Sequence, residues 1–119
     1  MNRIINDWKP ETLSLIQTLI KHGYSIESVD NGEEETDFNE VSLDTFVEQM
    51  MACDEAHLHI RTPEDRSGIL YLVYGNSPGE LVADYHVMDY LGRDKLDAAT
   101  DEHSKNWEGK PQPVTQQNC

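Results

Sequence analysis

Three short segments between residues 57 and 86 constrain the fold of this chain most strongly. Residues 57–61 alternate strictly between polar and apolar side chains, with Leu58 and Ile60 on one side. This is the pattern of a strand that is covered on one face only. Residues 69–74 form the most apolar run of the chain, and residues 81–86 follow after a turn with two glycines and a proline. Because short connections join antiparallel neighbours, we expect an antiparallel sheet with residues 69–74 near its centre.

Three helices are expected to accompany these strands. Apolar side chains recur at helical spacing over residues 9–22. Ser42 is a favourable N-cap for a second helix over residues 43–53. A third helix is expected from residue 87 or 88 to Trp107, with Gly92 as a candidate break.

One more strand and an acidic loop lie between the first two helices. Residues 24–29 alternate in polarity and end at a turn sequence over residues 30–32. The acidic residues 33–40 are expected to form an exposed loop, with a candidate short strand over residues 36–39. The expected order of elements is therefore α-β-α-β-β-β-α. The fold class is α+β, an antiparallel sheet of three to four strands with helices packed on one face.

Chain length, the first residues and the cysteines bound the domain and its compartment. We expect a single α+β domain over residues 1–110 and a disordered polar tail over residues 111–119. The first residues lack the apolar segment of a secretory signal, and no apolar run approaches the roughly 20 residues that span a bilayer. Cys53 and Cys119 are not expected to form a structural disulfide, because one lies in a predicted helix and the other is the last residue. These features favour a cytoplasmic protein.

Acidic residues dominate the charge of the chain. Twenty-three Asp and Glu face nine Lys and Arg, which gives a formal net charge of -14 at pH 7. Such an excess repels nucleic acid and anionic membranes and favours a cationic partner. Candidate binding acids lie after the turn at residues 30–32, on the outer face of the second helix and on the third helix. They are Glu33, Glu34, Glu35 and Asp37; Asp44 and Glu48; and Asp94, Asp97 and Asp101.

Four residues on two predicted strands offer metal-ligating chemistry. His57 and His59 alternate on one strand face, and Asp84 and His86 share a face of a later strand. If those faces coincide, groups of the types that bind zinc would approach one another. The alternative is that they are solvent-facing residues of a sheet covered on one side. No spacing typical of a metal site supports them, so no metal, cofactor or catalytic residue is expected.

Three stretches of the chain have sequences that occur together elsewhere. They are GYSIESVDNGEE (residues 23–34), LVYGNSPGELVADY (residues 72–85) and WEGKP (residues 107–111). These stretches resemble small uncharacterised acidic proteins of bacterial phages, prophages and plasmids, and the resemblance spans the chain from about residue 13 to residue 113. It implies a mobile genetic element as the context, in which small acidic proteins often inhibit host defence systems, some as mimics of DNA. It brings no catalytic assignment.

Charge and resemblance lead to three hypotheses of function. The first is a non-enzymatic protein that uses the candidate acids to bind a basic surface of a host protein, without binding nucleic acid or membrane itself. Its most specific form is a DNA-mimic inhibitor of a host defence or nucleic-acid-binding complex. The second is a homodimeric interaction or regulatory module whose acidity serves solubility, with an apolar patch around Tyr71, Tyr85 and Trp107. The third is a small metal-dependent enzyme that uses the His and Asp set.

Overall fold

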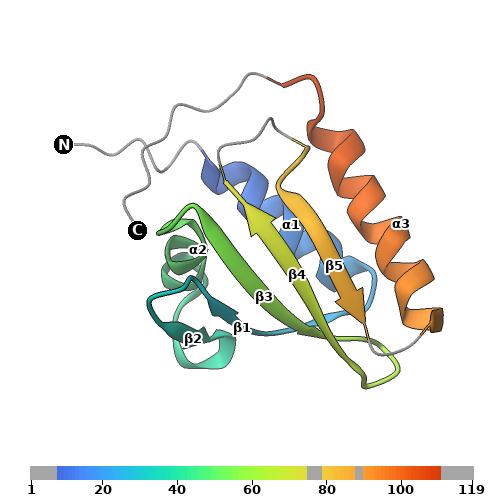
Figure 1. Cartoon of the computed structure of the whole chain (residues 1–119), viewed down its shortest axis with the longest axis horizontal. Coiled ribbons are helices and arrows are strands. Elements are labelled where there is room, and N and C mark those ends of the chain that lie inside the picture. Colours follow the sequence, from blue (N-terminus) through green and yellow to red (C-terminus); the bar gives the residue numbers. More distant parts are fainter. Residues whose placement is uncertain (1–7, 75–78, 88–89, 111–119) are drawn as a thin grey trace.

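The computed structural model describes residues 8–74, 79–87 and 90–110 (Figure 1). Within them, three helices and a five-stranded antiparallel sheet confirm the α+β class, in the order α-β-β-α-β-β-β-α. The helices are α1 (Lys9–Lys21), α2 (Leu43–Met51) and α3 (Tyr90–Trp107), with a short 3₁₀ turn η2 (Phe38–Glu40) before α2. The strands are β1 (Ser25–Asp30), β2 (Glu35–Asp37), β3 (Glu55–Arg61), β4 (Ser67–Val73) and β5 (Val82–Val87).

The strands lie in the order β2-β1-β3-β4-β5, and each neighbouring pair is antiparallel. The three later strands pair with one another as expected. The middle strand is β3 rather than the more apolar β4, because β1 pairs along the free side of β3. The expected count of three to four strands is exceeded because part of the acidic stretch forms β2, which pairs Asp37 with Ser28 and Glu35 with Asp30.

The helices begin and end close to their expected limits, with one clear difference. Ser42 caps α2, and its Oγ accepts a hydrogen bond from the Thr45 N–H at 3.2 Å. The α3 helix begins at Tyr90 and continues through Gly92, which does not break it. Its expected start at residue 87 is wrong, because Val87 ends β5 and is buried. Residues 88–89 and the expected tail over residues 111–119 lie outside the described residues. The expectation that Cys53 forms no disulfide is wrong, because Cys53 is disulfide-bonded.

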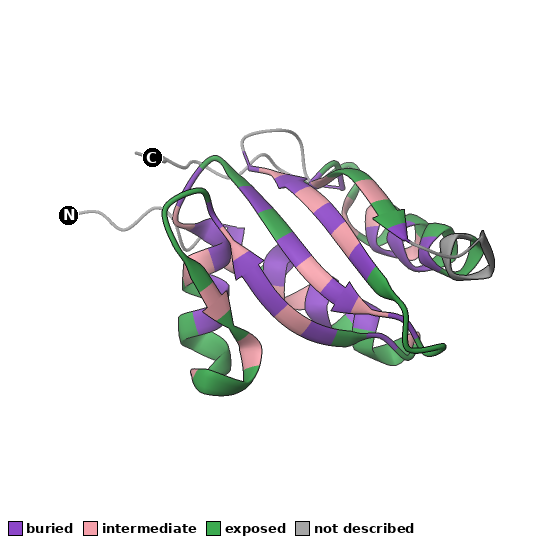
Figure 2. Cartoon of the chain, turned by 60° about the horizontal axis from the view of Figure 1, so that its bottom comes forward, coloured by how far each residue is buried: buried purple, intermediate pink, exposed green. Residues whose placement is uncertain are grey.

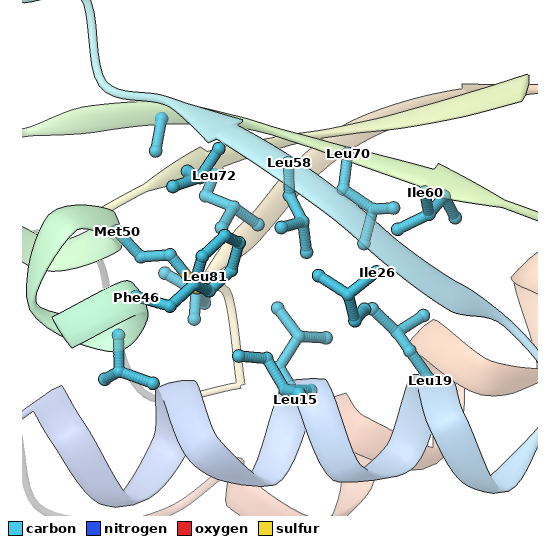
Figure 3. Packing of buried hydrophobic residues seen from close by; sticks show 14 of the residues in the cluster. Leu15, Leu19, Ile26, Phe46, Met50, Leu58, Ile60, Leu70, Leu72 and Leu81 are labelled. Atoms are coloured by element: carbon cyan, nitrogen blue, oxygen red, sulfur yellow. The ribbon is translucent and has the colours of Figure 1, made fainter. Parts of the chain in front are cut away.

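Burial alternates along the central strands. Figure 2 shows buried residues alternating with half-buried and exposed ones along the sheet. In β3 the inner residues are Ala56, Leu58 and Ile60. Figure 3 shows side chains of α1 and α2, among them Leu15 and Phe46, packed toward this face. The core therefore lies between the sheet and these helices, and the other side chains of β3 and β4 form an open face of the sheet.

No helix among the described residues is both long enough and apolar enough to cross a lipid bilayer.

Candidate functional site

The stretch between Lys21 and Arg61 contains eleven Asp and Glu and no Lys or Arg. It builds β1, β2, η2, α2 and the start of β3, so its charges gather on the β2 side of the sheet (Figure 1). We refer to these acids as the acidic edge. They are Glu27, Asp30, Glu33, Glu34, Glu35, Asp37, Glu40, Asp44, Glu48, Asp54 and Glu55. Glu27 and Asp30 are half-buried, and the other acids of the edge are exposed.

A single buried amide fixes the tip of the β1–β2 hairpin against α2. Asn31 is only 6% exposed. Its Oδ1 accepts the backbone N–H groups of Glu33 at 2.9 Å and Glu34 at 3.0 Å. Its Nδ2 donates to the carbonyl and side-chain oxygens of Gln49 on α2, at 3.1 and 3.2 Å. Because side-chain-to-backbone bonds of this kind hold a turn in one conformation, the backbone of Glu33 and Glu34 is held beside α2.

The α2 helix adds its own outward charges to the same region. Phe46, Val47 and Met50 face the core, so Asp44 and Glu48 lie on the exposed side of the helix. Asp44 pairs with Lys9 at 3.2 Å while its side chain remains 73% exposed. Among the described residues, Lys9 and Arg61 are the cations that form ion pairs with the acidic edge, and Arg61 contacts Glu27 at 3.0 Å. Two such pairs leave the edge strongly negative.

Two hollows open along the acidic edge. One, of about 420 Å³, lies where the hairpin tip meets the start of β3, and Asp30, Glu33, Asp54, Glu55 and His57 are among its lining residues. The other, of about 450 Å³, lies between β1 and η2 and is lined in part by Glu27, Asp37 and Glu40. Carboxylates around a hollow are the natural acceptors for Lys and Arg side chains. The hollows can therefore receive cationic side chains of a partner.

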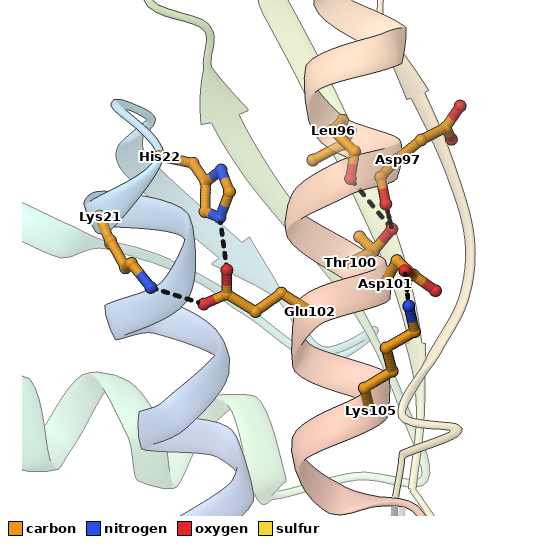
Figure 4. A network of polar contacts seen from close by, with 8 residues as sticks. All are labelled: Lys21, His22, Leu96, Asp97, Thr100, Asp101, Glu102 and Lys105. Atoms are coloured by element: carbon orange, nitrogen blue, oxygen red, sulfur yellow. Dashed lines mark hydrogen bonds and ion pairs between the residues drawn. The ribbon is translucent and has the colours of Figure 1, made fainter.

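The predicted acids of α3 lie elsewhere. The α3 helix runs beside β5, at the opposite end of the strand order from β2 (Figure 1). Asp94, Asp97 and Asp101 are exposed there. Asp97 accepts a hydrogen bond from the Tyr85 hydroxyl, and Asp101 pairs with Lys105 at 3.0 Å (Figure 4). The structure thus brings the hairpin and α2 acids together and separates the α3 acids from them.

The four candidate metal ligands share one face of the sheet without converging. Cross-strand register gives the rows His57–Tyr71–Asp84 and His59–Ile69–His86. Strand β4 lies between the two histidines of β3 and the candidates of β5, which separates them by two strand spacings, about 10 Å. The His57 ring instead stacks on Tyr71, with 4.9 Å between ring centroids. Among the described residues, no group of three or more His, Cys, Asp or Glu could hold a metal ion.

The expected apolar patch is divided between different surfaces. Tyr71 lies on the open face of β4, whereas Tyr85 is paired with Leu70 and shares the core face. Trp107 is half-buried, and its Nε1 donates to Ser14 Oγ on α1 at 3.0 Å. In the described chain the exposed large hydrophobic residues are Ile20 at 50% and Leu43 at 43%, on separate helices. Nothing in this arrangement favours the homodimer hypothesis.

The sequence hypotheses missed one buried polar cluster. Glu11, in the first turn of α1, is 1% exposed and its Oε2 accepts the Gly79 N–H at 3.1 Å. The same oxygen lies 3.0 Å from Nε2 of His103, which is fully buried. His103 follows Leu96 and Ala99 at helical spacing, so the inner stripe of α3 was the signal that could have located it. Because the cluster is closed to solvent, it joins α1, α3 and Gly79 and offers no access to a substrate.

The acidic edge is therefore the surface with the most distinctive chemistry in the described chain. Its features are exposed carboxylates, a fixed hairpin tip and hollows lined by acids. No protein-family model, no curated protein and no solved structure matches this chain.

Proposed function

We propose that this chain is a non-enzymatic binding protein whose acidic edge docks onto a Lys- and Arg-rich surface of a partner protein. The observation that carries the proposal is the concentration of eleven acids, without a single Lys or Arg, in the segment that forms one side of the fold. A solubilising surface needs only a mixture of charges, whereas a single-sign field steers an oppositely charged partner.

The fixed geometry of the edge supports docking over a diffuse charge effect. The Asn31 side chain ties the hairpin tip to α2, so the Glu33 and Glu34 backbone is held before a partner arrives. A surface that is already ordered loses less conformational entropy on binding. The acid-lined hollows give individual Lys or Arg side chains a place to insert.

The most specific form of the proposal is a mimic of nucleic-acid phosphates, which blocks a nucleic-acid-binding protein in the cytoplasm, including a host defence complex. The same negative field that attracts such a protein disfavours direct binding of nucleic acid or anionic membrane. Since Asp94, Asp97 and Asp101 lie beside β5, the proposed contact uses the acidic edge alone. The wider array that includes the α3 acids is not part of the proposal.

The test is affinity capture with the tagged protein from a bacterial lysate at low salt, with elution at high salt and mass spectrometry. The variant Glu33→Gln/Glu34→Gln/Glu48→Gln removes three charges from the acidic edge. The matched control Glu80→Gln/Asp94→Asn/Glu108→Gln removes three exposed charges from the other side of the molecule. Net charge changes equally in the two variants, so a difference between them reports the location of the contact.

We expect capture of nucleic-acid-binding proteins that elute with salt, are lost with the acidic-edge variant and are kept by the control. Opposite charges at a protein surface are screened over about 8–10 Å near physiological ionic strength, so the salt dependence should be steep. Equal capture by both variants, capture that does not respond to salt, or no captured partner would contradict the proposal.

A further inference from the structure

The outer edge of β5 is open to another strand. Strand β5 ends the order β2-β1-β3-β4-β5, and in the described part of the chain β4 is its neighbour on one side alone. An edge strand presents backbone N–H and C=O groups outward.

A groove runs along this edge between β5 and α3. Its volume is about 520 Å³, and its principal lining residues are Val82, Tyr85, Asp97, Thr100, Asp101 and Ser104. Figure 1 shows α3 extending beside β5 over most of the strand. The groove therefore has a strand edge on one side and a helix on the other, which is the form of site that binds peptides by strand addition.

Two carboxylates give the groove its charge. Thr100 Oγ1 donates to the carbonyl of Leu96 at 2.9 Å, and Ser104 Oγ donates to the carbonyl of Gly79 at 2.8 Å. Both hydroxyl protons are thus used within the fold. Asp97 and Asp101 line the groove and are exposed, although Asp97 accepts a hydrogen bond from the Tyr85 hydroxyl and Asp101 pairs with Lys105, and the described lining includes no Lys or Arg.

The spacing of these two acids fits an extended chain. Asp97 and Asp101 are four residues apart on α3, which corresponds to a rise of about 6 Å along the helix. Alternate side chains on a strand are about 6.7 Å apart and point to the same face. In a strand added to β5, the side chains on the face shared with Val82 and Tyr85 would point toward α3. Two alternate residues of such a strand therefore have the spacing of the two carboxylates.

We propose that the β5–α3 groove binds an extended peptide segment of a partner protein that carries Lys or Arg at alternate positions and adds to β5 as a sixth strand. Backbone hydrogen bonds to β5 hold the peptide, and Asp97 and Asp101 select its basic side chains. This surface lies opposite the acidic edge in the strand order, so the proposal does not depend on the function proposed for that edge.

The probe is a short synthetic peptide with lysine at alternate positions and threonine between them, labelled for fluorescence anisotropy. A second peptide has the same composition with its lysines clustered. Two further peptides carry N-methyl groups on the backbone amides of alternate residues, one on the odd-numbered and one on the even-numbered residues. The protein variants are Asp97→Asn/Asp101→Asn and the matched control Glu80→Gln/Glu108→Gln, which removes two exposed charges that belong neither to the groove lining nor to the acidic edge. Hydrogen–deuterium exchange of the β5 amides, with and without the first peptide, reports where it binds.

We expect the first peptide to bind and to slow exchange over Val82–Val87. The Asp97→Asn/Asp101→Asn variant should bind it about five- to tenfold more weakly, since two solvent-exposed charge pairs are lost. The Glu80→Gln/Glu108→Gln control should keep its affinity, and the clustered and N-methylated peptides should bind weakly. The proposal is overturned if no peptide binds, if N-methylation has no effect, or if protection appears on the β1–β2 hairpin instead of β5.

Discussion

The buried pair of Glu11 and His103 gives the sharpest test of how the helices are held together. The Glu11 carboxylate contacts the His103 ring at 3.0 Å and the Gly79 N–H at 3.1 Å, and the two side chains of the pair are 2% and 0% exposed. We consider the variants Glu11→Leu, His103→Leu and the double variant. Leucine fills a comparable volume without polar atoms, so the comparison isolates the polar contact from a cavity effect.

The magnitude follows from what each variant leaves behind. His103→Leu leaves the Glu11 carboxylate without its ring partner, and Glu11→Leu leaves both the His103 ring and the Gly79 N–H without theirs, so each single variant should lower the free energy of unfolding by about 3–5 kcal/mol. The double variant leaves only the Gly79 N–H without its acceptor, which costs about 1–3 kcal/mol. Within the described structure, Glu11 Oε1 and His103 Nδ1 are buried without a hydrogen-bond partner, and the double variant also removes these atoms. The two changes should therefore couple by at least about 3 kcal/mol.

Urea unfolding at neutral pH, followed by circular dichroism, measures these differences. The comparison requires that the free energy of unfolding falls with urea concentration at the same slope in all variants. Gln17→Leu and Asn106→Leu place the same residue at exposed positions of α1 and α3, and should change stability by less than about 0.5 kcal/mol. Additive costs of the two single changes, or a single change that costs less than about 1 kcal/mol, would refute the reasoning.

Three further perturbations test separate features. Hydrogen bonds from Lys21 and His22 lower the pKa of Glu102. These contacts therefore stabilise the fold fully above the pKa of an unfolded glutamate, about 4.3. Their contribution is lost as pH falls through the lower pKa of the folded state. Glu102→Gln should flatten this acid-side decline in urea titrations at a series of pH values, and an unchanged decline contradicts the assignment. Burial raises the pKa of Tyr74, so the unfolded chain loses that proton first and stability falls above about pH 10. Tyr74→Phe should lose less stability over that range, and an equal alkaline loss counts against the argument. Asn31→Ala should lower the free energy of unfolding by about 1–3 kcal/mol and speed amide hydrogen exchange at the hairpin tip. The exposed control Asn39→Ala should change neither quantity. Exchange that stays slow in Asn31→Ala would show that other contacts hold the tip.

Local sequence patterns were sufficient for most of the secondary structure. The apolar spacing of residues 9–22 predicted α1, and Ser42 marked the start of α2 within one residue. The strict alternation of residues 57–61 gave the inner and outer faces of β3. These patterns succeed because the side chains that a helix or strand buries recur with its own period, whatever the rest of the chain does.

The order of the strands in the sheet depended on contacts distant in sequence. The candidate strand over residues 36–39 is present but begins earlier, as β2 over Glu35–Asp37, where it pairs with β1. The pairing of Val29 with Leu58 crosses the whole of α2, and no local signal specifies it. A β-strand can pair on either side, so the choice of neighbours depends on how the helices cover the sheet.

The charges of the candidate surfaces were evident from the sequence, but their placement was not. Composition gave the excess of acids, and the tertiary structure separated the acidic edge from Asp97 and Asp101 beside β5. The pair of Glu11 and His103 joins residues 92 positions apart, and neither neighbourhood in the sequence indicates the other. The sequence by itself determined the elements, their buried faces and the sign of the surface, because these follow from local periodicity and composition. Only the tertiary structure decided which side chains meet, because strand pairing and helix packing bring together residues that are far apart along the chain.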